Sequence, residues 1–238
     1  MNTRFDFRLL LFVFLVALLP ACRPAPEPAL SPEELVAQSA ARLTDLAGFH
    51  FLLEASGPAA YLDAEETLAL RRIEGDFVAP DRVRAVVRVA VPGLVTEVRV
   101  IGIGEQQWQT NVLTGAWEAM PSEWGFNPAI LFDETVGLPA ILAQDLSDVV
   151  LAEPETINGV QMDVITAVIA PDRLASMSSG LMATDLTAPI PVQLWIAPDR
   201  YDLHRIVLTE PVADAAEPRR WQVDFSQFDQ ATPIEPPE

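Results

Sequence analysis

The sequence predicts an α+β fold in which short helices cover the apolar face of a single antiparallel sheet. Three observations indicate this class: many segments alternate apolar with polar residues, turn signals separate these segments closely, and helical periodicity is confined to short stretches. Turns this close together require hairpins between neighbouring strands. We therefore expect a meander of half-buried strands.

The N-terminus has the three parts of a signal peptide in order. Arg4 and Arg8 precede an apolar run from Leu9 to Leu19, which is too short for a membrane-spanning helix of about 20 residues. The run ends in Leu19-Pro20-Ala21-Cys22, which resembles the bacterial lipobox and contains the sole cysteine. We therefore expect residues 1–21 to be a lipoprotein signal peptide and Cys22 to carry diacylglycerol and palmitate. The alternative is an ordinary secretory signal followed by a free thiol.

The chain from Cys22 onward divides into a tether, one domain and a tail. Residues 22–30 comprise the lipidated cysteine and a proline-rich tether that cannot form a helix. Residues 31–230 contain no linker and no fixed repeat, so we expect a single domain, followed by an extended tail over residues 231–238. Two or more acyl chains would hold the domain on a membrane. We expect it in the cell envelope, on the outer face of the cytoplasmic membrane.

Helix signals occur in four places. Ser31 is a suitable N-cap, Pro32 occupies the first helical position, and Glu34 closes a capping box. The first helix should therefore run from Pro32 to about Asp45. The other three segments are short and comprise residues 127–132, 136–146 and 171–177. In the segment 136–146, one helical face gathers Leu138, Ile141, Leu142 and Leu146.

Strand periodicity begins after Gly48 and recurs to the end of the domain. Apolar side chains alternate with polar ones in Phe49–Ser56, Val83–Val89 and Thr96–Ile101. Residues 106–111 and 115–120 should form a further hairpin that carries Trp108 and Trp117. Strand signals return at residues 148–152, 160–170, 190–197, 202–210 and 220–228.

The apolar face of this sheet is the candidate binding surface. Its lining residues are Phe49, Phe51, Leu53, Val83, Ala85, Val87, Val89, Val98 and Val100 from strands, with Leu138, Ile141 and Leu142 from a helix. Because the helices are short, two interpretations are open. These residues form a closed core, or they line an apolar space that lipid fills, with about 25 cal/mol gained per Å² of apolar surface removed from water. The residues alone favour the closed core.

Composition excludes several function classes. The chain has 34 acidic residues against 15 basic ones, all of them arginine, and its net charge of −19 repels nucleic acid. One cysteine and two histidines give no basis for a thiolate cluster or a zinc site. His50 and His204 stand near no Gly-x-Ser-x-Gly motif, so we expect each on the solvent face of its strand. We therefore predict no catalytic residue, no metal and no cofactor.

Basic residues on the polar face of the sheet have two interpretations. Arg82, Arg84, Arg88 and Arg99 could bind an anionic lipid head group. The simpler expectation is that they face solvent and pair across strands with Glu97 and neighbouring acids. Acidic pairs such as Glu65 with Glu66 are expected by chance among so many carboxylates, and we interpret them as solvated surface.

A succession of short segments resembles the LppX/LprG-type lipoproteins. Behind the lipobox, the segments that carry the resemblance are Ile73–Pro80, Trp117, Phe126–Leu131 with Gly137-Leu138, Ile157–Val160, and Pro191–Pro198 with Leu203–Arg205. Each segment is common alone, whereas their order over most of the mature chain is specific. The resemblance implies a LolA/LolB-like fold, a strongly curved half-barrel sheet whose concave side is lined by helices and holds acyl chains.

The resemblance also implies a function, and it favours the lipid-filled interior over the closed core. Members of this family are expected to bind lipids or acylated glycolipids and to move them across the cell envelope. We therefore expect a monomeric, membrane-anchored, non-enzymatic carrier whose bound lipid is cargo, with a membrane transporter as a candidate partner. The alternative is a non-transporting sensor or scaffold that regulates a membrane signalling partner, and a well-packed, lipid-free interior would favour it.

Overall fold

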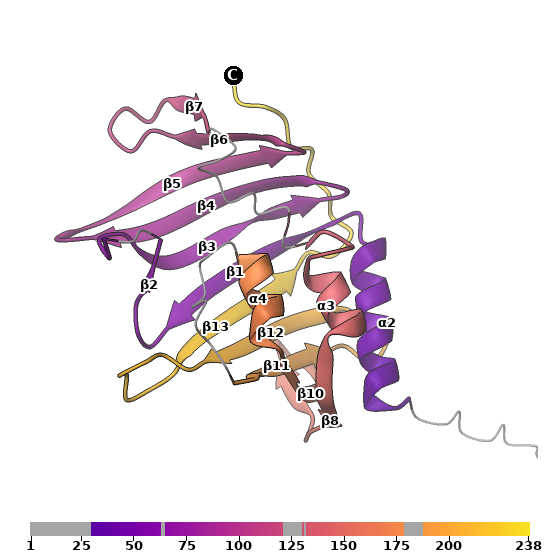
Figure 1. Ribbon diagram of the computed structural model, residues 1–238. Helices are drawn as coiled ribbons and strands as arrows, with labels where there is room; N and C mark the ends of the chain where they lie inside the picture. The colour runs from indigo at the N-terminus through magenta and orange to yellow at the C-terminus, as the bar shows by residue number, and fades with distance from the viewer. Residues whose placement is uncertain (1–29, 63–64, 121–129, 131, 179–187) are drawn as a thin grey trace, which may run out of the picture.

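Residues 30–62, 65–120, 130, 132–178 and 188–238 are described by the computed structural model of the chain (Figure 1). The expected signal peptide, Cys22 and all but the last residue of the tether lie outside them. Most of the helix expected at residues 127–132 also lies outside the described residues. These expectations stay predictions.

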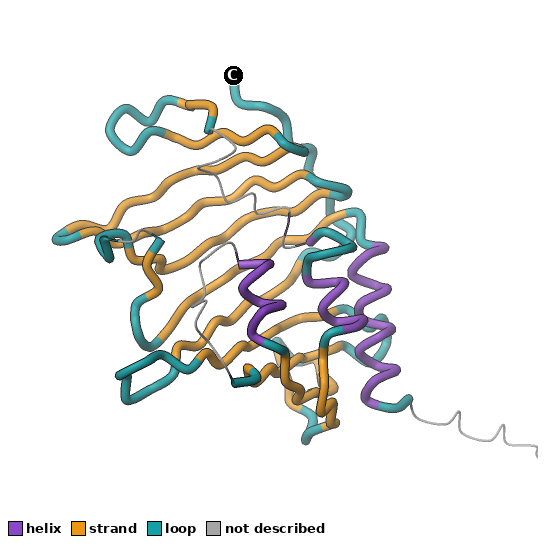
Figure 2. The backbone as a smooth tube through the Cα atoms, viewed as in Figure 1, coloured by secondary structure: helices purple, strands orange, loops and turns teal. Residues whose placement is uncertain are grey.

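A single open sheet of 13 antiparallel strands forms the body of the molecule (Figure 2). Its order is β7-β6-β5-β4-β3-β1-β13-β12-β11-β10-β8, with β2 beside β3 and β9 beside β10. The strands are β1 (Gly48–Ser56), β2 (Ala60–Tyr61), β3 (Ala69–Val78), β4 (Arg82–Val91), β5 (Leu94–Ile103), β6 (Gln106–Thr110), β7 (Trp117–Ala119), β8 (Leu146–Leu151), β9 (Glu155–Ile157), β10 (Val160–Ile169), β11 (Ile190–Ile196), β12 (Leu203–Glu210) and β13 (Arg219–Ser226).

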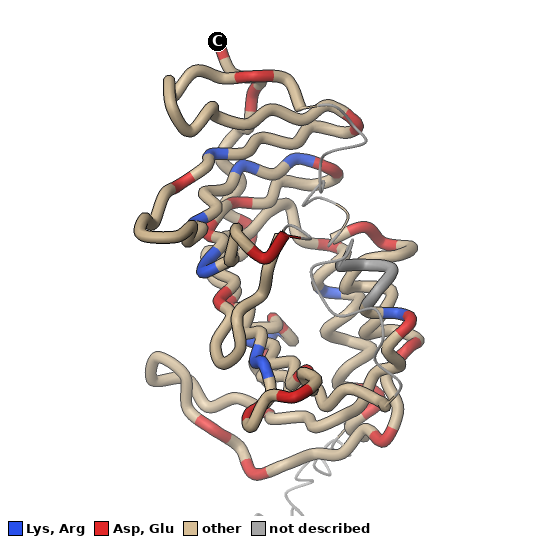
Figure 3. The backbone as a smooth tube through the Cα atoms, turned by 60° about the vertical axis from the view of Figure 1, so that its left-hand side comes forward, with Lys and Arg blue, Asp and Glu red and all other residues tan. Residues whose placement is uncertain are grey.

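The sheet consists of two wings joined through β1. Strands β3 to β7 follow one another on one side of β1, and β13 back to β8 follow on the other. Each wing is largely a meander, as predicted, but the pairing of β1 with β13 connects segments far apart in the chain. The sheet curves strongly around the helices (Figure 3). The predicted half-barrel with short helices on its concave side is therefore confirmed.

Helix α2 (Pro32–Asp45) begins where the capping-box pattern predicts. The Ser31 hydroxyl accepts a hydrogen bond from the Glu34 backbone N–H at 3.2 Å, and the Glu34 carboxylate accepts one from the Ser31 N–H at 2.7 Å. The apolar stripe of α2 is buried in the main core. Helices α3 (Leu138–Gln144) and α4 (Pro171–Ser178) lie on the same side of the sheet (Figure 1).

An ion-pair cluster fastens α2 to the sheet. Arg42 donates from Nε to Asp202 Oδ1 at 2.7 Å, just before β12, and from Nη2 to Asp229 Oδ2 at 2.5 Å, just after β13. Arg200 Nη2 donates to the same Asp229 oxygen at 2.8 Å. The hydrogen bond between Arg42 and Asp229 lowers the pKa of the carboxyl and raises that of the guanidinium. The cluster holds α2 over one end of the concave face.

The structure corrects the expected helix at residues 136–146. Helix α3 ends at Gln144, and Leu146 is the first residue of β8, where it pairs with Ile169 of β10. Leu146 is therefore not on the helical face predicted for it. The open edge of β10 provides backbone partners, and this pairing outweighs the helical spacing of the side chains.

Three strands are not predicted by the alternation of apolar and polar residues. In β3, a register shift between Leu70 and Arg72 moves the apolar positions by one residue, which breaks the period of two. Strands β2 and β9 contain two and three residues, too few to show alternation. Strand β9 nevertheless has a packing role, because Ile157 helps to cover a second apolar cluster on the convex face around Trp195.

The C-terminal tail, residues 231–238, has no helix or strand, and it packs onto the domain. It runs along the ends of β3, β4 and β5 (Figure 1). Ile234 is only 1% exposed, and Arg82 Nη1 donates to its carbonyl oxygen at 2.7 Å. Burial of Ile234 therefore ties the last residues to the wing that contains β4.

Candidate functional site

The concave face carries a continuous apolar row across its centre. Cross-strand partners in this row are Val98 with Val87, Val87 with Ile73, Ile73 with Leu53, Leu53 with Val223, and Val223 with Ile206. We call these six residues the central row. Directly opposed residues of antiparallel strands have Cβ atoms about 4.5–5.5 Å apart, so their side chains form one surface across β5, β4, β3, β1, β13 and β12.

The central row is only partly covered. Ile73 and Ile206 are buried, whereas the other four side chains are half-buried: Leu53, Val87, Val98 and Val223. All six are aliphatic, so the row offers no hydrogen bond and no charge to a ligand. Such a surface can accept hydrocarbon, because removing it from water contributes about 25 cal/mol per Å².

The end of the concave face near α2 and α3 is a packed aromatic cluster. The Phe132 ring centroid lies 4.8 Å from that of Phe49, 4.9 Å from Phe77 and 5.4 Å from Phe51. Phe225 meets Phe49 nearly edge-on at 5.5 Å. All five rings are buried. We call these five residues the aromatic end, and it forms closed core.

A close approach of two strands shapes the floor between the aromatic end and the central row. Gly75 of β3 pairs with Phe51 of β1 and with Ala85 of β4. A Cβ atom on Gly75 would lie 2.8 Å from the Cα atom of Ala85, closer than real Cβ contacts. Glycine therefore permits this spacing, and with Ala85 it keeps the floor free of large side chains.

A buried polar cluster fixes the opposite end of the concave face. Arg219 Nη1 lies 3.1 Å from both carboxylate oxygens of Glu210, and the Trp221 indole N–H donates to Glu210 at 2.6 Å. Arg219 also donates to the carbonyl oxygen of Pro58 at 3.0 Å. Glu210 is fully buried, and these bonds compensate for the loss of its hydration. The cluster ties the β12–β13 hairpin to the segment after β1.

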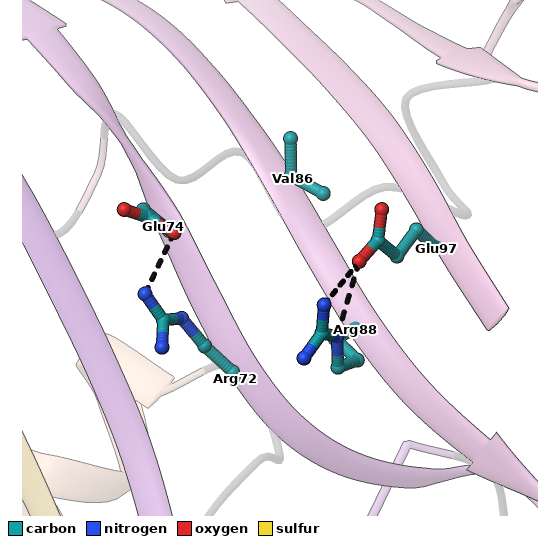
Figure 4. A pocket seen from close by; sticks show the side chains of 5 residues that line it. All are labelled: Arg72, Glu74, Val86, Arg88 and Glu97. Atoms are coloured by element: carbon teal, nitrogen blue, oxygen red, sulfur yellow. Dashed lines mark hydrogen bonds and ion pairs between the residues drawn. The ribbon is translucent and has the colours of Figure 1, made fainter. Parts of the chain in front are cut away.

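On the convex face of β3, β4 and β5, charged side chains surround a hollow. A shallow hollow of about 180 Å³ is lined by Arg72, Glu74, Val86, Arg88 and Glu97 (Figure 4). Its arginines already have carboxylate partners: Arg72 Nη2 lies 2.8 Å from Glu74, and Arg88 Nη2 lies 2.6 Å from Glu97. Exposed pairs of this kind contribute little to stability and present no apolar surface. The hollow is therefore a poor site for hydrocarbon.

The predicted cross-strand pairing of arginines is confirmed at two positions. Arg88 pairs with Glu97, as expected, and Arg84 Nη2 lies 3.1 Å from Asp76. Arg82 instead hydrogen-bonds to the C-terminal tail.

The two histidines occupy different environments. His50 lies on the convex face, where its Nδ1 is 2.9 Å from Asp76 Oδ1. Burial alone would raise the pKa of Asp76, but hydrogen bonds from His50 and Arg84 outweigh it and lower that pKa. His204 is half-buried beside the Phe228 ring, at a centroid distance of 5.0 Å, and burial lowers its pKa. The solvent-face expectation therefore describes His50 better than His204.

The predicted lining residues lie in two environments. Eight are buried: Phe49, Phe51, Val83, Ala85, Val89, Val100, Ile141 and Leu142. Four are half-buried: Leu53, Val87, Val98 and Leu138. The half-buried strand residues Leu53, Val87 and Val98 belong to the central row. That the predicted residues line a lipid site stays a prediction, and the burial pattern restricts it to these positions.

Sequence reasoning missed the contribution of the C-terminal strands. Val223 and Ile206 complete the central row, and Phe225 belongs to the aromatic end. Their alternation was visible in the segments 202–210 and 220–228. The missing information was the pairing of β13 with β1, which no local pattern reveals.

Two further observations concern the described part of the chain. No helix within it is long and apolar enough to cross a membrane. Its His, Cys, Asp and Glu residues form no group of three or more that could hold a metal ion.

Comparison with known proteins finds one family and several solved structures. A model of the LppX_LprAFG lipoprotein family matches residues 31–234. LprF from Mycobacterium bovis aligns with a TM-score of 0.67 and 16% identity over 87% of this chain and 96% of that one. The lipoprotein LppX from Mycobacterium tuberculosis aligns with a TM-score of 0.60 and 16% identity over 86% of this chain and 98% of that one. No curated protein matches the sequence.

These likenesses differ in what they support. The family match confirms the resemblance found in the sequence, and the two mycobacterial structures support the fold. A LolA-superfamily protein from Nitrosomonas europaea aligns over 86% of this chain with a TM-score of 0.29 and 9% identity, which is too distant to support an inference.

Proposed function

Because this chain belongs to the LppX_LprAFG lipoprotein family, we propose that it binds the acyl chains of a lipid or acylated glycolipid against the central row. It carries this lipid within the cell envelope and acts without a catalytic residue. The observation that carries the proposal is the burial of the central row: four aliphatic side chains stay half-buried on the inner face of a sheet whose neighbouring end is fully packed.

The geometry supports acyl chains as the ligand. The central row crosses six strands without a polar side chain, so it matches an extended hydrocarbon and not a ligand that needs directed hydrogen bonds. The aromatic end supplies a wall of buried rings beside the row. We infer that acyl chains lie along the row, with Phe51 and Phe132 in the wall beside it.

The anchor is a separate part of the proposal. Cys22 becomes the lipidated first residue of the mature protein, and residues 23–30 tether the domain to the outer face of the cytoplasmic membrane. Replacing Cys22 by alanine should abolish labelling of the full-length chain by a fatty-acid probe, measured after metabolic incorporation in bacteria. Labelling that persists in the Cys22→Ala chain would contradict the anchor but leave the binding proposal intact.

The binding proposal is tested by the lipid content of the purified protein. The mature chain, residues 22–238 with Cys22→Ala, has no acyl group of its own and is called here the unlipidated chain. It should release diacyl or triacyl lipid on extraction with organic solvent, identified by mass spectrometry. A lipid-free protein that also takes up no fluorescent fatty-acyl probe would overturn the carrier function and favour the sensor or scaffold alternative.

A matched pair of variants locates the ligand. Val87 belongs to the central row, whereas its neighbour Val86 lies on the convex face of the same strand and is exposed. Val87→Trp should lower probe uptake at least fivefold, because the indole occupies the space of the acyl chain. Val86→Trp should leave uptake within twofold of the parent. Equal uptake by both variants would place the ligand elsewhere.

A further inference from the structure

Two hairpin tips project from one end of the sheet. In the β4–β5 turn, Leu94 is 61% exposed and Val95 58%, and in the β6–β7 loop, Val112 is 59% exposed and Leu113 92%. We call these four residues the tip patch. Strands β4 to β7 are consecutive in the sheet, and both tips lie at the end of the strands away from α2 (Figure 1). Large aliphatic side chains this exposed on adjacent hairpins indicate an interaction surface.

The tips are uncharged in a strongly acidic chain. Residues 89–96 and 106–117 contain no acidic or basic side chain, although 21% of the chain is charged and its net charge is −19. The charged positions lie outside the tips of both hairpins (Figure 3). Removing a charge from water is costly, so a surface that enters an apolar medium must lack charges, whereas a turn that stays in water need not.

Three backbone N–H groups at the tip of the β6–β7 loop donate to acceptors within the loop. Asn111 Oδ1 accepts from the N–H groups of Leu113 and Thr114 at 2.9 and 3.1 Å. The Asn111 carbonyl oxygen accepts from the Gly115 N–H at 2.8 Å. Hydrocarbon offers no hydrogen bonds, so a segment that enters it must satisfy its own backbone. A protein partner would supply such bonds, and these donors do not require them.

We propose that the tip patch inserts into the surface of a lipid bilayer composed of zwitterionic or uncharged lipids. Acyl chains would then pass between that bilayer and the concave face at this end of the sheet. The net charge of the chain opposes binding to anionic lipids, so the attraction comes from the aliphatic tips. The inference rests on the proposed function, because a carrier must meet a membrane to load or release lipid.

Co-sedimentation of the unlipidated chain with phosphatidylcholine vesicles tests the proposal. The parent chain should sediment with the vesicles, and Leu94→Asp with Leu113→Asp should lower its partition coefficient at least tenfold. The control places the same two charges at Val136 and Val150, which are 42% and 55% exposed and lie outside the tip patch. Val136→Asp with Val150→Asp should stay within twofold of the parent. Equal losses in both double variants, or no loss in the tip variant, would contradict insertion.

A fluorescent reporter gives an independent readout that does not depend on the aspartate variants. The unlipidated chain contains no cysteine, so Leu113→Cys and Val150→Cys each provide a unique thiol for an environment-sensitive NBD label. The label at position 113 should brighten and shift to the blue on addition of phosphatidylcholine vesicles, and lipids with a spin label on the acyl chain should quench it. The label at position 150 should do neither. Identical responses at the two positions would overturn the proposal.

Bilayer insertion is distinguishable from lipid uptake and from self-association. Probe uptake without vesicle binding would contradict insertion of the tip patch and support the carrier function. Vesicle binding without probe uptake would support insertion and contradict the carrier function. A parent chain that is dimeric without vesicles and monomeric after the tip substitutions would show that the occupant is a second copy, which contradicts bilayer insertion. Sedimentation velocity of the parent and tip variant measures this.

Discussion

The aromatic end and the central row share strands β1, β3 and β13, yet the side chains of one are fully buried and most of those of the other are half-buried. On β1, Phe49 is 1% exposed whereas Leu53 is half-buried, and on β4, Val83 is fully buried whereas Val87 is half-buried. On β13, buried Phe225 gives way to half-buried Val223. Burial therefore changes within two to four residues along strands of similar apolar character.

Two physical differences explain the contrast. The aromatic end has bulky rings from three strands that meet Phe132 above them, and α2 and α3 pack in the same core cluster. The central row has valine at its β4, β5 and β13 positions, and these three side chains stay half-buried. Val83 and Val87 are the same residue type on one strand, so cover by Phe132 and the helices, rather than strand propensity, decides which part of the face is packed.

The largest expected effect compares two truncations on β1. Phe49→Ala removes a ring that touches Phe77, Phe132 and Phe225, so it should lower the free energy of unfolding by about 3–5 kcal/mol. Leu53→Ala should cost about 2 kcal/mol or less, because the side chain is already partly in water. Urea unfolding of the lipid-free unlipidated chain measures both. Equal losses would show that the central row is as tightly packed as the aromatic end.

A smaller effect comes from overpacking two positions of β4. Val83→Trp should destabilise the lipid-free chain by about 1–3 kcal/mol, because Val83 is completely buried. Val87→Trp should change the denaturant midpoint little, because its side chain faces a partly open surface. The same unfolding assay applies, and strong destabilisation by both variants would indicate a closed interior and oppose the carrier function.

The sequence revealed most of the architecture but not the boundary between these two regions. Capping chemistry located α2, and the period of two located most longer strands, because both signals are local. Leu53 and Phe51 have the same alternation, so nothing local distinguishes a half-buried side chain from a buried one. That difference depends on Phe132 and on the pairing of β1 with β13, which are contacts between distant segments.

The smallest expected effect on the free energy of unfolding comes from the ion pair that holds α2 over the aromatic end, and it depends on pH. The pKa of Asp229 is lowered in the folded protein by the hydrogen bond from Arg42. The ion pair therefore contributes its full stability at pH values above the ordinary pKa of an aspartate, and this contribution is lost as the pH falls through the lower pKa of the folded state. Asp229→Asn should therefore cost up to about 1 kcal/mol at pH 7 and progressively less below about pH 4, because the pair is partly exposed.

Chemical denaturation of parent and variant at several pH values measures this difference, with exposed Asp214→Asn as the control. Probe uptake should be unaffected by Asp229→Asn at pH 7, because the substitution acts on the helix-covered end and not on the central row. A stability difference that grows as the pH falls would contradict the assigned role of the Arg42 cluster.

The position of the bound acyl chain tests the central claim most directly. The unlipidated chain, loaded with a phosphatidylcholine whose acyl chain carries a diazirine, is irradiated, and the modified residues are identified by peptide mass spectrometry. Crosslinks should concentrate on the central row, at Leu53, Val87, Val98 and Val223, and be rare at Phe49 and Val83 of the same strands. Crosslinks on the convex face around Val86, or an even distribution along β1 and β4, would contradict a lipid site on the half-open centre of the concave face.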